Sequence, residues 1–204
     1  MKSADRKRKR KQEIINASLE IFARRGYHAA GIADIAGLLG IGHGTIYRYF
    51  KSKEDILHAA VDLIIRDMTR MIVRERPEAS QTLEEYSEQI DRIGHSFFEL
   101  FRSDPRRALI LLQEAPAVDE SIRRKLQRSS EMSSLFIERY IRNGIGRGYL
   151  RLGIDVPIAA RAVNAMMFEA IRQSLQESEQ GLDDLYRRWT VTITQLMLSG
   201  MQRA

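Results

Sequence analysis

Apolar residues recur at helical spacing along almost the whole 204-residue chain, and this periodicity constrains the fold more than any other feature. Spacings of three and four residues place side chains on one face of an α-helix, whereas a half-buried strand needs strict alternation. No segment alternates over a useful strand length. The sequence therefore predicts an all-α protein.

Cap and breaker residues divide this pattern into about nine helices. The first ends at Arg25 and Gly26, a basic last turn followed by a glycine that favours a helix C-terminus. Ser52 and Asp55 form a variant capping box that predicts the start of a fourth helix, and Pro77 stops that helix. The later predicted helices are one that ends before Ser103, a short one from Pro105 to Pro116, and three spanning about 119–143, 155–178 and 182–200.

Composition indicates a globular chain with enough length for one ordinary domain or two small ones. Hydrophobic residues make up 44% and charged residues 29%, and cysteine is absent, which excludes disulfides and thiolate metal sites. No apolar run approaches the roughly 18 residues of a membrane span. The basic N-terminus leads into an amphipathic pattern instead of the apolar core of a signal peptide. A soluble cytoplasmic protein is expected.

Positive charge is concentrated at the N-terminus. Residues 1–53 carry 12 lysines and arginines against four acidic residues, whereas residues 54–204 carry 21 against 23. One interpretation of the run in residues 2–11 is a solvated, disordered tail. The other is an arm that contacts DNA phosphates or the minor groove. The arm residues are Arg6, Lys7, Arg8, Lys9, Arg10 and Lys11.

The stretch LGIGHGTIYRYF, residues 39–50, raises a choice between a phosphate-binding loop and a turn between helices. Phosphate loops follow a strand, so that backbone N–H groups converge on the anion, but residues 31–39 have helical spacing. The stretch also lacks the G-x-G-x-x-G spacing, and no GK[ST] motif occurs in the chain. The glycines of residues 144–148 likewise follow a predicted helix. A nucleotide-binding loop is therefore not predicted.

A helix-turn-helix accounts for the same residues. A short helix over 32–38 needs a sharp turn into a second helix over 44–50, and Gly40 tolerates the left-handed conformation of such a turn. Gly42 precedes the second helix as its N-cap, and apolar side chains point into the domain. The side chains left on the outer surface, where a major groove is read, are His43, Thr45, Tyr47, Arg48 and Tyr49.

Residues 12–57 resemble the DNA-binding domain of the TetR family of bacterial transcriptional regulators. The matching segments are ARRGYHAA, IADIA and GTIYRYFKSKEDIL. Three residues depart from the family pattern: Gly31 replaces a Ser or Thr cap, Leu39 a typical Ala, and Gly42 a typical Ser. The resemblance implies a basic arm over 1–11, a helix-turn-helix domain over 12–55, and a ligand-binding and dimerisation domain over 56–204.

The resemblance also implies roles for individual residues. The family uses the positions of His43, Thr45 and Arg48 near base edges, and those of Tyr47 and Lys53 for phosphates. Base contacts carry specificity, and phosphate contacts carry salt-sensitive affinity. The predicted DNA contacts are His43, Gly44, Thr45, Tyr47, Arg48, Tyr49 and Lys53.

A ligand pocket among the middle helices is a further implication of the resemblance. Aromatic and Met residues at helical spacing are candidate linings, although such residues are more often plain core. The segments GIGRGYLRLGIDVPIAARA and LDDLYRRWTVTITQLMLSGM are similar to regulators that respond to fatty acyl thioesters. The candidate ligand-binding residues are His95, Phe98, Phe101, Phe136, Tyr140, Arg142, Asn164, Met167 and Phe168.

The last two predicted helices carry wide apolar faces, more than one chain needs to cover itself. A two-fold contact of four helices would use these faces and present two reading helices to a palindromic site. The predicted interface residues are Ile158, Ala162, Ala165, Ile171, Trp189, Ile193 and Leu196.

We therefore expect a sequence-specific DNA-binding regulator, a homodimeric repressor released from a palindromic operator by a small lipophilic ligand such as a fatty acyl thioester. A ligand-dependent activator or a co-repressed regulator of the same fold remains an alternative, and a nonspecific DNA-binding protein is a remote one. The chain has no G-x-S-x-G or H-E-x-x-H motif, and its four histidines are scattered. No enzyme activity, cofactor, metal or membrane partner is predicted.

Overall fold

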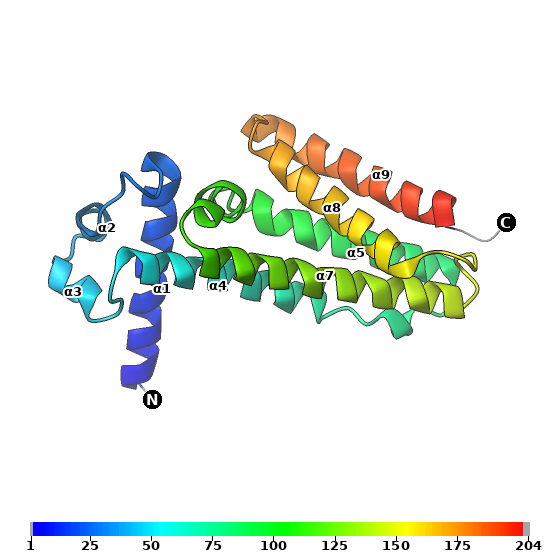
Figure 1. Ribbon diagram of the computed structural model, residues 1–204, viewed down its shortest axis with the longest axis horizontal. Coiled ribbons are helices and arrows are strands. Elements are labelled where there is room, and N and C mark those ends of the chain that lie inside the picture. The colour runs from blue at the N-terminus through cyan, green and yellow to red at the C-terminus, as the bar shows by residue number, and fades with distance from the viewer. Residues whose placement is uncertain (1, 202–204) are drawn as a thin grey trace. The chain divides into compact units, whose positions relative to one another are not determined.

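The computed structural model describes residues 2–201 and is helical throughout (Figure 1). In that range the chain forms nine α-helices and four short 3₁₀ or π segments, and no β-strand. The prediction of an all-α fold with about nine helices is confirmed. The α-helices are α1 (Lys2–Arg25), α2 (Ile32–Leu39), α3 (His43–Tyr47), α4 (Lys53–Ile72), α5 (Leu83–Arg102), α6 (Arg106–Leu109), α7 (Glu120–Gly146), α8 (Val156–Ser174) and α9 (Leu182–Met201).

The chain folds into two compact units. One contains the residues up to 66 together with 106–124, and the other contains 67–105 together with the residues from 125 onward. The sequence analysis placed a single boundary at residue 55, whereas residues 106–124 also pack in the first unit. This packing involves residues far apart along the chain, which local sequence patterns do not encode.

The first unit is built on the amphipathic face of α1. Ile15, Leu19 and Phe22, predicted to share a face, are all buried, and Phe22 has no exposed surface. They belong to a core that includes Ile35 of α2 and Ile46 of α3. Each such side chain contributes roughly 1.5–3 kcal/mol by leaving water.

Helix α1 begins at Lys2, so the predicted arm is the first three turns of this helix in the described part of the chain. The arm side chains are exposed except that of Arg10, which is half-buried and pairs with Glu13 at 2.8 Å. The ammonium group of Lys11 lies 5.0 Å from the ring centroid of Phe50, just beyond α3. A helix of about 10 Å diameter does not fit a minor groove about 6 Å wide, so the helical form favours phosphate contacts.

Between residues 106 and 117 the structure differs from the single short helix that was predicted. Helix α6 passes into a π-helical segment, Ile110–Glu114, and then into a 3₁₀ turn, Ala115–Ala117. Pro116 does not end the helical path as expected; it lies inside the 3₁₀ turn, near whose start its missing N–H is tolerated.

The second unit consists mainly of α5, α8 and α9 with the larger part of α7. Helix α9 packs against both α5 and α8, and α8 and α9 run side by side (Figure 1). The side chains of Thr82 and Asp155 cap α5 and α8, accepting from the N–H groups of Glu85 and Ile158. Within residues 2–201 no helix has the length and apolarity required to cross a bilayer.

Candidate nucleic-acid interface and apolar cavity

The turn between α2 and α3 has the geometry expected of its glycines. Gly40 adopts the left-handed conformation, with φ 61° and ψ 35°, and its N–H donates to the C-terminal carbonyls of α2. Gly42 is the N-cap of α3 in an extended conformation, and its carbonyl accepts from the N–H of Thr45 at 2.8 Å. A side chain at Gly40 would be strained, which explains the glycine at this residue.

Helix α3 presents polar side chains to solvent and buries its apolar ones. His43, Tyr47 and Arg48 are exposed, and 57% of the Tyr47 surface is accessible. Ile46 and Phe50 are buried in the first unit. His43 and Tyr47, four residues apart, share one face of the helix. The structure thus brings these candidates together on α3 and the residue that follows it.

The remaining candidates on α3 and the residues just after it are less accessible. Thr45 and Tyr49 are half-buried, so each exposes only part of its side chain. Gly44 is exposed, and a Cβ at this residue would meet no atom within 4 Å. The backbone at Gly44 is therefore open to close approach by another molecule.

An acidic side chain forms one half of a capping box at the start of α2. The Asp34 carboxylate accepts a hydrogen bond from the N–H of Gly31 at 2.8 Å and also pairs with the guanidinium of Arg25. These contacts join the end of α1 to the start of α2. Gly31 has no side chain, so the other half of the box, a side-chain acceptor for the first N–H groups of α2, is missing.

Lys53 lies at the first turn of α4, but its ammonium group is already engaged by the protein. It donates to the carbonyls of Tyr27, His28 and Ala30 at 2.8, 3.3 and 2.9 Å. It also lies 4.3 Å from the ring centroid of Tyr27. An ammonium has three donors, and here all three are directed to backbone carbonyls. In this structure Lys53 holds the α1–α2 turn, and its contact with a DNA phosphate stays a prediction.

Residues 106–124 also contact the end of α1 and the turn that follows it. The Glu114 carboxylate accepts from the N–H of Tyr27 at 2.6 Å, and Arg106 pairs with Glu20 of α1 at 2.7 Å. Sequence reasoning missed both contacts. Nothing local to Glu114 or Arg106 signals a partner more than 80 residues away.

Asp119 is the N-cap of α7 and connects it to α4. Its carboxylate accepts from the N–H of Ile122 at 2.8 Å and lies 3.0 Å from Nε2 of His58. The Ile122 amide foremost, together with the side chains of Ser121 and His58, lowers the pKa of Asp119 to about 2. The carboxylate is therefore ionised at neutral pH and complements the N-terminus of α7.

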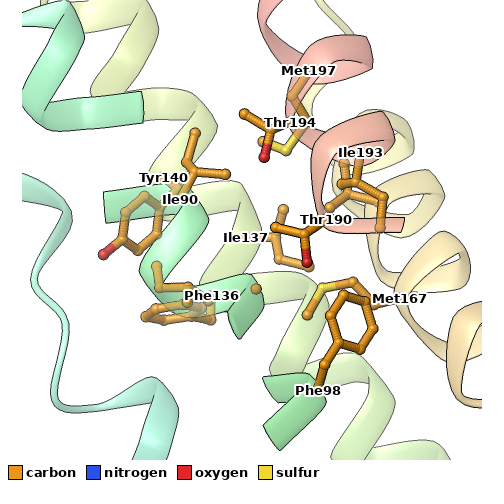
Figure 2. Close-up of a pocket in the computed structure, with 13 residues that line it drawn as sticks. Ile90, Phe98, Phe136, Ile137, Tyr140, Met167, Thr190, Ile193, Thr194 and Met197 are labelled. Carbon is orange, nitrogen blue, oxygen red and sulfur yellow. The ribbon is translucent and has the colours of Figure 1, made fainter. Parts of the chain in front are cut away.

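The second unit contains a partly open apolar cavity of about 50 Å³ between α5, α7, α8 and α9 (Figure 2). Among residues 2–201, no lysine, arginine, histidine, aspartate or glutamate lines it. Its lining residues are Ile90, Ile93, Gly94, Phe98, Phe136, Ile137, Tyr140, Val163, Met167, Thr190, Ile193, Thr194 and Met197.

Four of the candidate ligand-binding residues line this cavity: Phe98, Phe136, Tyr140 and Met167. Phe101 does not; it is fully buried, and its ring packs 5.3 Å from that of Phe97. Phe98 and Phe101 are three residues apart on α5, and helical spacing alone does not distinguish an aromatic residue that lines a cavity from one that fills a core.

The other candidates lie elsewhere. Asn164 and Phe168 line a separate hollow between α7 and α8, where Nδ2 of Asn164 donates to Ser130 at 3.0 Å. His95 and Arg142 are exposed and do not line the cavity, so their predicted role as polar anchors is corrected. Charged and imidazole groups stay in water because their burial without a partner is unfavourable.

The cavity contains hydroxyl groups that sequence reasoning did not select. The hydroxyl of Thr194 donates to Asp91 at 2.7 Å. Those of Thr190 and Tyr140 are buried and have no hydrogen-bond partner among the described residues. The available signal was the pair of threonines four residues apart on the apolar stripe of α9, which places both on one face.

The predicted interface residues on α8 and α9 divide into two groups. Ile158 and Leu196 are more than half exposed, and Ala162 and Ala165 are exposed as well. Trp189 is half-buried, and its indole N–H donates to Gln173 at 3.1 Å. Ile171 and Ile193 are instead buried within the protomer, which corrects their assignment to the outer face: the two helices use part of their apolar surface on their own core.

Comparisons with known proteins agree with this arrangement. Residues 14–60 match the family profile described as bacterial regulatory proteins, tetR family. The fatty acid metabolism regulator protein of Bacillus subtilis is 27% identical over 81% of this chain and 83% of its own length. The repressor KstR2 of Mycolicibacterium smegmatis is 23% identical over 80% of this chain and 78% of its own. The crystal structure of FadR from Bacillus subtilis with stearoyl-CoA is 26% identical, with a TM-score of 0.73, and the match covers 93% of this chain and 98% of that one.

The family profile covers the helix-turn-helix unit, and the relatives that span most of the chain are transcriptional regulators. The exposed polar surface of α3 occupies the part of the fold that the profile matches. The protein is a DNA-binding transcriptional regulator and not an enzyme. Its helix-turn-helix unit matches the TetR family of bacterial regulatory proteins, and most of the chain is similar to the fatty acid metabolism regulator protein and to KstR2.

Proposed function

We propose that this protein is a homodimeric repressor that leaves a palindromic operator when a lipophilic acyl compound enters the apolar cavity. The observation that carries the proposal is the cavity itself, which no charged side chain lines in the described part of the chain. Such a site suits a hydrocarbon chain. The similarity to a FadR that was crystallised with stearoyl-CoA supports an acyl compound as the effector.

The reading surface of the proposed repressor is α3 with the residues that follow it. Arg48 is exposed, and arginine can donate two hydrogen bonds to a guanine edge. His43 and the exposed part of Thr45 contact neighbouring bases, and the hydroxyl of Tyr47 contacts a phosphate. Tyr49, being half-buried, contributes packing and a smaller backbone contact.

The basic turns at the start of α1 contribute affinity that does not depend on sequence. Arg6, Lys7, Arg8 and Lys9 are exposed, and the helix carries them past Phe50 at the end of the reading segment. Contacts of this kind release counterions from DNA, so they make binding steeply dependent on salt.

The cavity must widen to hold a long acyl chain. Its volume of about 50 Å³ has room for only a few water-sized groups. Met167 and Met197 line it, and unbranched thioether side chains repack readily. Widening on effector entry supplies the difference between the two states that any ligand-driven release requires.

The first experiment measures binding of the purified protein to the DNA upstream of its own gene, with random DNA as competitor and salt as a variable. We expect protection of a palindrome by an even number of chains and release when octanoyl-CoA or a longer acyl-CoA is added. Binding that is equal on random DNA would contradict operator recognition. Operator binding that no acyl-CoA changes would contradict the effector class alone.

The exposed apolar face of α8 and α9 is the proposed dimer interface, and its centre can be tested with one substitution. Replacing Leu196 with glutamate is expected to convert the dimer to a monomer, because a four-helix contact would bury the new charge. Analytical ultracentrifugation measures the result. Leu152→Glu is the matched control: Leu152 is 83% exposed and lies outside α8 and α9, so this variant should remain dimeric. A dimeric Leu196→Glu protein would place the interface elsewhere.

A further inference from the structure

We infer that the hydroxyl of Thr190 donates a hydrogen bond to the effector, so that the cavity recognises a neutral carbonyl oxygen of an acyl thioester or ester and not only a hydrocarbon chain. The inference rests on the proposed acyl effector, and it identifies Thr190 as the residue that binds the carbonyl oxygen of that effector.

Thr190 combines burial with an unused hydrogen-bonding group. Its side chain lines the cavity from α9, and only 8% of the residue is exposed. Its Oγ1 has no hydrogen-bond partner among residues 2–201, although threonine in a helix often donates to the carbonyl four residues earlier. Figure 2 shows the hydroxyl directed between Ile137 and Met167, both of which line the cavity.

The neighbouring helix restrains the orientation of this side chain. A Cβ placed on Gly94 of α5 would come within 3.3 Å of the methyl carbon Cγ2 of Thr190 and 3.8 Å of Oγ1. The methyl group is therefore packed against the backbone of α5. This packing leaves the Thr190 side chain little room to move, and it keeps the buried Oγ1 in the cavity wall.

Thr194 shows that a hydroxyl on this wall can be satisfied within the protein. It lies one turn further along α9 and lines the same cavity, and its hydroxyl donates to Asp91 at 2.7 Å. The Tyr140 hydroxyl also lacks a partner among residues 2–201, but in Figure 2 it lies on the side of its ring away from Ile137. Thr190 is therefore the hydroxyl placed to meet a ligand inside the cavity.

The residues around Thr190 favour a neutral carbonyl oxygen over a charged carboxylate. None of the described residues that line the cavity is cationic, so a buried carboxylate would lose its hydration without gaining a counter-charge. A thioester or ester carbonyl is neutral and needs only one donor. Satisfying a buried hydroxyl that is otherwise unpaired favours the bound state.

The test compares octanoyl-CoA with S-octyl-CoA, a thioether that has a methylene in place of the carbonyl. Calorimetry with the intact protein should show about five- to tenfold tighter binding of the thioester, as expected for one neutral hydrogen bond. Thr190→Val keeps the shape of the side chain and removes the hydroxyl, so it should bind both compounds equally. Thr194→Val should retain the preference for the thioester.

Thermal unfolding of the two variants tests whether each substitution removes the hydrogen bond, or the unpaired hydroxyl, assigned to it. Thr190→Val should melt at or above the temperature of the parent, because it removes an unpaired buried hydroxyl, whereas Thr194→Val should melt lower because Asp91 loses a partner. Equal binding of the two compounds by the parent overturns the inference, and so does a thioester preference that survives in Thr190→Val. If neither compound binds, the proposed effector class fails and the inference fails with it.

Discussion

Replacing Lys53 with methionine is expected to lower the free energy of unfolding by about 2–4 kcal/mol. Methionine is similar in length, but it has no ammonium group to lie over the Tyr27 ring or to donate to the carbonyls of Tyr27, His28 and Ala30. Those carbonyls belong to the turn that joins α1 to α2, so the loss affects the whole helix-turn-helix unit. Urea unfolding followed by circular dichroism measures the change.

Lys51→Met is the matched control for this prediction. Lys51 is exposed, two residues earlier in the chain, and the substitution removes the same charge. We expect it to change stability by less than about 0.5 kcal/mol. If Lys53→Met is as stable as the parent and only weakens DNA binding, then Lys53 contacts phosphate and its role in holding the turn is wrong.

Replacing Arg48 with alanine is expected to weaken operator binding by about 10- to 100-fold, the effect of one bidentate base contact of about 1–3 kcal/mol. Binding to random DNA should fall much less, so the ratio of the two affinities should decrease. Arg48 is exposed after the last turn of α3, so stability should be unaffected. Fluorescence anisotropy with both DNA duplexes at fixed salt measures this ratio.

Arg66→Ala provides the control for charge. Arg66 is exposed on α4, 13 residues from the start of that helix and therefore about 20 Å along it. It should lower affinity for both duplexes slightly and leave their ratio unchanged. An Arg48→Ala protein with an unchanged ratio would exclude Arg48 from base recognition and shift attention to His43 and Thr45.

Features that depend on neighbouring residues were predictable. Helical spacing predicted the all-α fold, and the glycine at residue 40 predicted the left-handed turn that the structure contains. The cap predicted at Ser52 was also found, since its hydroxyl accepts from the N–H of Asp55 at 3.2 Å. These features depend on steric contacts and hydrogen bonds within a few residues, so they can be predicted from the sequence.

The sequence by itself determined the helices, the helix-turn-helix and the concentration of positive charge at the N-terminus. Only the tertiary structure decided that Lys53 holds a turn 23–26 residues away and that Glu114 reaches Tyr27. It also decided that Thr190 lines a cavity while Ile171 lies in the core. The physical reason is that periodicity shows which side chains share a helix face. What each face meets depends on packing between distant segments, and that packing exists only in the folded chain.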